Sequence, residues 1–220
     1  MIIKVRNFII FYFVFLSFSL NAQEIDKTYY LLGAVDNYSG RNYELKNSEY
    51  KGYVLKVNNR ETNKIKRLEQ VSGLKFSKFS SETLEDWVSL NSDRYEKEIN
   101  QFYSFSKVKG AENYHGKLNR DRVLKGTKNQ LLSYLLGSFF IHGNIKTEND
   151  GGDTYEVYEI SVANAQPQFE VLKAILKELG VYTIKEEIWY KIPFTFHVKF
   201  SPDSDLKTLL DKELAYRNNN

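Results

Sequence analysis

The chain has 220 residues, of which 42% are hydrophobic, 27% charged and 15% aromatic. This apolar share is enough for a buried core, so a mainly disordered chain is excluded, and the length suits one large domain or two small ones. The absence of cysteine excludes disulfides and thiolate metal sites. The formal charge of +3 includes two cations within residues 1–22. The remaining chain therefore lacks the strongly basic balance of most nucleic-acid binders.

Residues 1–22 are predicted to be a cleavable secretory signal. Lys4 and Arg6 precede the apolar run from Phe8 to Leu20, which has 13 residues. A bilayer-spanning helix needs about 20 residues, so the run fits the apolar core of a signal better. We expect cleavage after Ala22, export to the periplasm or out of the cell, and no stable membrane span in the mature chain. An uncleaved membrane anchor is the competing interpretation.

Two short motifs occur twice in the rest of the chain, in the same order. Tyr30-Leu31-Leu32-Gly33-Ala34 returns as Tyr134-Leu135-Leu136-Gly137-Ser138. Each copy is followed by the pattern Tyr-x-[Leu/Ile]-x-Val-x-Asn, at residues 53–59 and 158–164. Apolar and polar side chains alternate in this pattern, which is typical of a half-buried strand. The sequence therefore predicts an internal duplication.

The duplication divides the chain into a first repeat over 23–105, a linker over 106–130 and a second repeat over 131–220. Both repeats are predicted to follow the order α-β-β-α-β-β-α. The linker holds seven Lys or Arg residues against two acids. A solvated connection is the simpler interpretation of this basic segment, and contact with phosphate groups is the alternative.

The individual elements follow from hydrophobic spacing and from glycine and proline positions. In the first repeat we expect a helix that ends at Gly73, strands over 74–79 and 87–90, and a helix over 94–103. In the second repeat we expect a helix from Pro167 to Gly180, strands over 181–192 and 195–200, and a helix over 206–216. Gly151-Gly152 is predicted to form a hairpin turn. Trp87, Trp189 and Tyr190 are expected to pack in the core.

This order of elements, with two apolar helices that each lead into a glycine-containing turn, resembles the LAGLIDADG homing endonucleases in their single-chain, two-repeat form. The resemblance covers nearly all of residues 27–216. It implies an α+β fold with a pseudo-twofold, saddle-shaped mixed or antiparallel sheet and helices on one face. It also implies a monomer with pseudo-dimer symmetry. The small residues that would let the two motif helices approach closely are Gly33, Ala34, Gly137 and Ser138.

In that family, each motif helix delivers one acid, just before its final glycine, to divalent metals that activate water. Tyr38 and His142 stand at these positions, and the nearby Asp36 alone cannot build a paired-metal site. We therefore expect no cofactor and no nuclease activity by the family mechanism, with Mg²⁺ relevant only if residual activity exists. Zinc has little support, because His115, His142 and His197 lack any ligand spacing.

The charge of the second hairpin adds to this interpretation, because residues 144–160 carry one lysine against five acids and would repel phosphate groups. The function predicted from the sequence is an exported, non-catalytic protein that binds an unknown ligand or protein. The alternative is an intracellular LAGLIDADG-type protein that binds DNA or RNA, such as a degenerate homing endonuclease or a maturase-like protein. An enzyme with unrelated chemistry at His142 and Asp36 has no positive support.

Overall fold

The computed structural model describes residues 24–35, 37, 41–46, 49–51, 55–80, 87–107, 109–110 and 113–218. The predicted signal, Asp36 and Tyr38 lie outside these residues. The fold is α+β, as predicted, and every strand pair in the described ranges is antiparallel. No helix within those ranges is long and apolar enough to cross a membrane.

The described elements follow one another along the chain as two groups. The first group is α2 (Lys27–Ala34), β1 (Arg41–Lys46), β2 (Glu49–Lys51), β3 (Leu55–Asn58), α3 (Thr62–Ser72), β4 (Ser77–Ser80), β5 (Trp87–Asn91), α4 (Asp93–Asn100), β6 (Tyr103–Lys107), β7 (Asn113–Leu118) and α5 (Arg120–Val123). The second group is α6 (Lys128–His142), β8 (Gly143–Asp150), β9 (Asp153–Ala163), α7 (Gln166–Leu179), β10 (Tyr182–Trp189), β11 (Thr195–Ser201) and α8 (Ser204–Asn218).

The strands are divided among three sheets rather than joined in the single saddle expected from the sequence. Their strand orders are β2-β1-β7-β6, β3-β5-β4 and β10-β11-β9-β8. The division arises because β1 pairs with β7, with Arg41 opposite Gly116, and not with β3. The first group of elements therefore contains two small sheets where the second contains one.

Part of the strand order is nevertheless common to both groups. In each group, one long helix is preceded by one strand and followed by two. The strand before the helix pairs with the second of the two strands after it, and these two strands also pair with each other. This gives β3-β5-β4 around α3 and β9-β11-β10 around α7. Val57 faces Val88 in the first arrangement, and Val162 faces Phe196 in the second. The duplication itself stays a prediction.

The segment 106–130, expected as a linker, contains regular secondary structure. This segment contains the end of β6, all of β7 and α5, and the start of α6. β7 pairs with β1 on one side and with β6 on the other. The backbone groups of β7 bind in these two ladders, so the strand forms without a continuous apolar run in its sequence.

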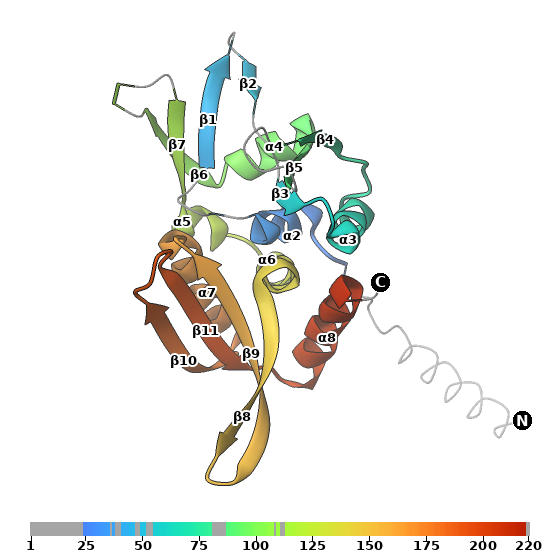
Figure 1. The fold of residues 1–220 in the computed structure, drawn as a ribbon, viewed down its shortest axis with the longest axis vertical. Helices are drawn as coiled ribbons and strands as arrows, with labels where there is room; N and C mark the ends of the chain where they lie inside the picture. The colour runs from blue at the N-terminus through green and yellow to red at the C-terminus, as the bar shows by residue number, and fades with distance from the viewer. Residues whose placement is uncertain are drawn as a thin grey trace, which may run out of the picture.

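The helices α2 and α6 lie at the centre of the molecule, with the first group of elements on one side and the second on the other (Figure 1). α6 is apolar around most of its circumference, which is typical of a helix buried on all sides. Thr127 and Gln130 begin it with a reciprocal capping box. As predicted, Pro167 lies in the first turn of α7 and Gly180, with φ 75°, ends it.

Candidate functional site

The two central helices are in direct backbone contact at their glycines. A Cβ atom added to Gly33 would lie 2.0 Å from the carbonyl oxygen of Tyr134, and one added to Gly137 would lie 2.0 Å from the carbonyl oxygen of Tyr30. Each glycine therefore faces the residue three positions before the other glycine. Only a residue without a side chain fits at either position, because the obstructing atoms belong to the backbone.

Polar side chains tie the end of α2 to its neighbours. The Ser138 hydroxyl of α6 donates to the carbonyl of Gly33 at 2.9 Å. The Gln168 side-chain amide of α7, which is fully buried, donates to the carbonyls of Gly33 and Val35 at 3.4 Å each. These donors satisfy carbonyls that the end of the helix would otherwise leave without partners.

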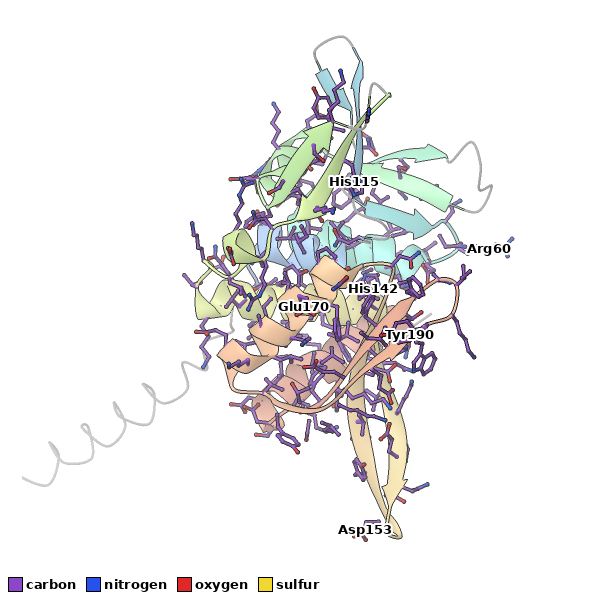
Figure 2. The ribbon with its side chains drawn as sticks, turned by 90° about the vertical axis from the view of Figure 1, so that its left-hand side faces the viewer. Arg60, His115, His142, Asp153, Glu170 and Tyr190 are labelled. Atoms are coloured by element: carbon purple, nitrogen blue, oxygen red, sulfur yellow. The ribbon has the colours of Figure 1, made fainter. Side chains whose placement is uncertain are left out.

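The described side chains next to the same helix end include neutral groups. Asn37 is buried, donates to the carbonyl of Val35 and accepts a hydrogen bond from the Tyr103 hydroxyl. His142 is the last residue of α6 and is half-buried (Figure 2). No group of three His, Cys, Asp or Glu side chains that could hold a metal occurs in the described residues. Amides and hydroxyls are poor substitutes for the two carboxylates that a paired Mg²⁺ site requires.

A buried ion pair joins the two groups of elements beside these helices. Arg67 of α3 donates hydrogen bonds from its Nε and Nη2 atoms to the two carboxylate oxygens of Glu213 in α8. The Tyr30 hydroxyl donates to the same carboxylate at 2.6 Å, and the Tyr216 ring lies 4.1 Å from the guanidinium carbon. Burial raises the pKa of Tyr30 well above its usual value, so the phenol stays protonated as a donor.

The sheet of the second group has one apolar face and one charged face. Tyr158, Ile160 and Val198 belong to the buried core on the face covered by α6 and α7. The strand register places the alternate residues on the opposite face, which we call the outer face. It carries Lys146, Glu148, Glu159, Ser161, Lys185, Glu187, Trp189, His197 and Lys199.

Glu159 is the most connected residue of the outer face. Its carboxylate accepts hydrogen bonds from Lys146 at 2.8 and 2.9 Å, from Ser161 at 2.7 Å and from Nδ1 of His197 at 3.0 Å. Burial alone would raise the pKa of Glu159, but these three donors outweigh it and lower the pKa to about 2. Glu159 is therefore a buried, permanently charged acceptor at neutral pH.

The geometry around His197 differs from that of a hydrolytic triad. Ser161 and Glu159 both contact Nδ1, at 2.7 and 3.0 Å. In a triad the acid and the nucleophile contact opposite ring nitrogens, because the histidine must accept a proton from one while the other orients it. Nε2 of His197 is buried without a hydrogen-bond partner, and the Trp189 ring lies over the imidazole with centroids 4.1 Å apart. Ser161 is therefore not positioned as an activated nucleophile.

The lysines of the outer face are already matched by acids of the same chain. Lys146 pairs with Glu159, Lys199 with Glu148 and Glu187, and Lys185 with Glu187. In the hairpin formed by β8 and β9, whose five acids were expected to repel phosphate groups, Glu156 pairs with Lys207 of α8. These contacts partly neutralise the negative charge of the hairpin. They also mean that each lysine of the outer face named above is in an ion pair.

A different part of the chain carries more described cations than acids. The exposed basic residues of β6, β7, α5 and the segments next to them are Lys107, Lys109, Lys117, Arg120, Arg122, Lys125 and Lys128. Asp121 is the described acid among them. This set, which we call the basic surface, falls largely within the segment predicted as a linker. His115 lies half-buried on β7 beside it (Figure 2).

The expected core positions of Trp189 and Tyr190 are wrong. Trp189 is 48% exposed and Tyr190 is 79% exposed, because β10 is an edge strand and ends at Trp189. Tyr190 directly follows β10, at the turn of the β10–β11 hairpin, and lies far from Asp153 at the β8–β9 turn (Figure 2). The side chain of Trp87 lies outside the described residues.

Sequence reasoning missed the cluster of Glu159, Ser161 and His197. The available signal was the polar alternation of β9, which places Glu159 and Ser161 on the same face. His197 joins them only through the pairing of β9 with β11, in which Ser161 faces His197. No family model matches the chain, and no curated protein matches it.

Proposed function

We propose that this protein is an exported, non-catalytic binding protein with a LAGLIDADG-like frame, and that the outer face of its β8–β11 sheet receives the ligand. The observation that carries the proposal is the internal neutralisation of that face. Its buried acid, Glu159, is held by three donors, and its lysines form ion pairs. Such a face offers polar contacts and an aromatic edge but little net attraction for a polyanion.

The resemblance to the LAGLIDADG fold is supported by two features of the structure. The first is the reciprocal contact of Gly33 and Gly137 with the opposite helix. The second is the strand order common to β3-β5-β4 and β9-β11-β10. Both are what a duplicated unit would produce if its two copies met about a pseudo-twofold axis.

The lack of catalysis is supported by the sequence, which has Tyr38 and His142 where the family has its two acids, and by the described amides of Asn37 and Gln168, which bind backbone carbonyls next to the end of α2. We expect the purified chain to leave supercoiled plasmid intact in Mg²⁺ and in Mn²⁺. The matched control is Asp36→Ala, since Asp36 is the acid closest to the family's positions. Metal-dependent cutting that this substitution abolishes would overturn the proposal.

A second candidate function is nucleic-acid binding inside the cell, and the basic surface is the specific observation in its favour. Seven exposed cations on or next to β6, β7 and α5 would release counterions on contact with phosphate groups. The two functions are distinguished by the fluorescence anisotropy of labelled duplex DNA and single-stranded RNA at increasing salt. The binding-protein proposal expects no saturable signal at physiological salt.

Charge-reversal variants make this comparison specific. For nucleic-acid binding, Lys117→Glu combined with Lys125→Glu should weaken binding and reduce the salt slope by about two. The exposed lysines Lys177 and Lys212, on α7 and α8, provide a control pair with the same change of charge. Equal loss in both pairs would indicate a general effect of charge rather than a binding surface.

Export is tested by fractionating the producing cells and mapping the N-terminus by mass spectrometry. A species that begins at Gln23 outside the cytoplasm is the expected result. An intact Met1 in the cytoplasm would reverse the order of the two candidate functions.

A further inference from the structure

The end of β10 and the loop that joins it to β11 expose an apolar segment. Residues 188–194 read Ile-Trp-Tyr-Lys-Ile-Pro-Phe, and we call them the apolar tip. Ile192 is 98% exposed, Tyr190 79%, Phe194 49%, Trp189 48% and Ile188 40%. Isolated apolar side chains are common on protein surfaces, but five in one seven-residue segment indicate a contact that the described part of the chain does not supply.

The apolar tip is held in place by the neighbouring strand connection. Asn164, which follows β9 with φ 46°, donates its backbone N–H to the carbonyl of Phe194 at 2.7 Å. Its side-chain oxygen accepts from the N–H of Phe194 at 3.0 Å. Asparagine tolerates this left-handed conformation better than most residues. The base of the tip is therefore fixed to the sheet, Trp189 packs over His197, and the side chains of Tyr190 and Ile192 are mostly exposed.

The charge of the apolar tip selects among the surfaces that could cover it. Lys191 is its single charged residue, and no acid occurs from 188 to 194. The adjacent acids are neutralised, because Glu186 pairs with Lys173 and Glu187 pairs with Lys185 and Lys199. The tip thus combines apolar side chains with one uncompensated positive charge.

The residue types fit the boundary of a lipid bilayer. Trp and Tyr rings are amphipathic and concentrate at the level of the lipid headgroups, whereas Ile and Phe partition more deeply. A lysine beside them can keep its apolar stem in the lipid and its ammonium group among anionic headgroups. Ile188 and Trp189 end β10 and lie on opposite faces of that strand, whereas Tyr190, Ile192 and Phe194 belong to the loop that follows. The loop residues can therefore enter a bilayer without rearrangement of the sheet.

We propose that the apolar tip inserts into the interface of a membrane that contains anionic lipid, with Trp189 and Tyr190 at the headgroup level and Ile192 below them. This inference does not depend on the ligand of the outer face or on the place where the chain acts. The tip docks the protein peripherally, and the sheet behind it stays in water.

The experiment uses the full chain carrying Trp87→Phe, which leaves Trp189 as the single tryptophan of the two in the sequence. Vesicles of phosphatidylcholine with phosphatidylglycerol are compared with vesicles of phosphatidylcholine alone. We expect the emission of Trp189 to shift to shorter wavelength on the anionic vesicles and to be quenched by bromine-labelled lipid. Residues 1–22 contain no tryptophan, so this signal reports the tip and not the apolar leader.

Three variants of the same chain complete the test. Ile192→Ser should weaken vesicle binding, measured by the Trp189 signal, by about tenfold or more. Lys191→Glu should remove the preference for anionic vesicles. Tyr182→Ser is the matched control, because Tyr182 is 71% exposed at the opposite end of β10, and it should leave binding unchanged.

Vesicle association without a change in Trp189 emission would show that the leader alone binds lipid, and it would overturn the proposal. An unchanged Trp189 signal with both kinds of vesicle and no association would also overturn it. In that case the apolar tip would have to be covered by a protein surface.

Discussion

Replacing Gly137 by alanine tests whether the direct contact between α2 and α6 is required for stability. Alanine is the better helix former by about 1 kcal/mol, so helix propensity alone predicts a more stable protein. The structure predicts the opposite, because the new Cβ atom would lie 2.0 Å from the Tyr30 carbonyl oxygen and 3.2 Å from the Ala34 nitrogen. Ordinary contacts of a Cβ atom begin at 3.4 Å, so the helices must separate by more than about 1 Å.

Separation of the helices loosens the packing of the largest buried side chains, among them Tyr30, Tyr134 and Phe140. Overpacking of this kind costs about 1–3 kcal/mol and occasionally more, so we expect Gly137→Ala to lower the free energy of unfolding by about 2–4 kcal/mol. Gly33→Ala should cost a similar amount. The double variant should cost less than the sum, since one separation of the helices relieves both clashes.

Urea denaturation followed by circular dichroism measures these differences. Gly180→Ala is the matched control, because Gly180 has φ 75° and open space around its missing Cβ. It tests left-handed backbone strain alone, which costs roughly 1–2 kcal/mol. A Gly137→Ala variant as stable as the natural chain, or more stable, would refute the contact between the helices as described.

Three further predictions concern buried charge and one turn. Glu213→Gln should cost about 3–5 kcal/mol in urea denaturation, because it leaves Arg67 buried beside a neutral group; a loss below about 1 kcal/mol would contradict the buried pair. Glu159 has its pKa lowered from 4.5 to about 2 in the folded chain, so its stabilisation of about 3 kcal/mol is complete above pH 4.5 and is lost as the pH falls through about 2. Glu159→Gln should flatten the dependence of stability on pH over that acid range. An unchanged dependence would argue against Glu159 as a charged acceptor for its three donors. Asn164→Ala should cost about 1–2 kcal/mol, since it removes the acceptor for the Phe194 N–H and leaves a residue with φ 46°; a melting temperature equal to that of the natural chain would argue against this anchor.

The second group of elements could be predicted well from its sequence, because its helix signals and strand alternation agree. Pro167 and Gly180 mark the two ends of α7, and Gly151 and Gly152, both with positive φ, form the predicted hairpin turn. Asp203, directly before α8, accepts from the backbone N–H of Leu206 as a helix cap. Local chemistry was sufficient at each of these places.

The first group could be predicted less well, because its strands depend on distant partners. β7 has few consecutive apolar residues and is ordered by pairing with β1, some seventy residues earlier in the chain. The predicted helix over 94–103 ends at Asn100, and Tyr103 instead begins β6. The exposure of Trp189 could not be predicted from the local sequence pattern either, because it follows from the position of β10 at a sheet edge.

The pairing of Arg67 with Glu213 has a consequence for how the chain folds. The two residues are separated by 146 positions, and Tyr30, which donates to the same carboxylate, is separated from it by 183. An N-terminal segment that leaves the ribosome before α8 is made would therefore hold an unmatched guanidinium and an uncovered face of α3 and α2. Contacts between residues so far apart in sequence slow folding. They can form only after α8 has been made, so we expect the two groups of elements to fold together at that stage. The two groups of elements should consequently fail to fold when they are produced as separate chains, and co-production of both should restore a soluble complex.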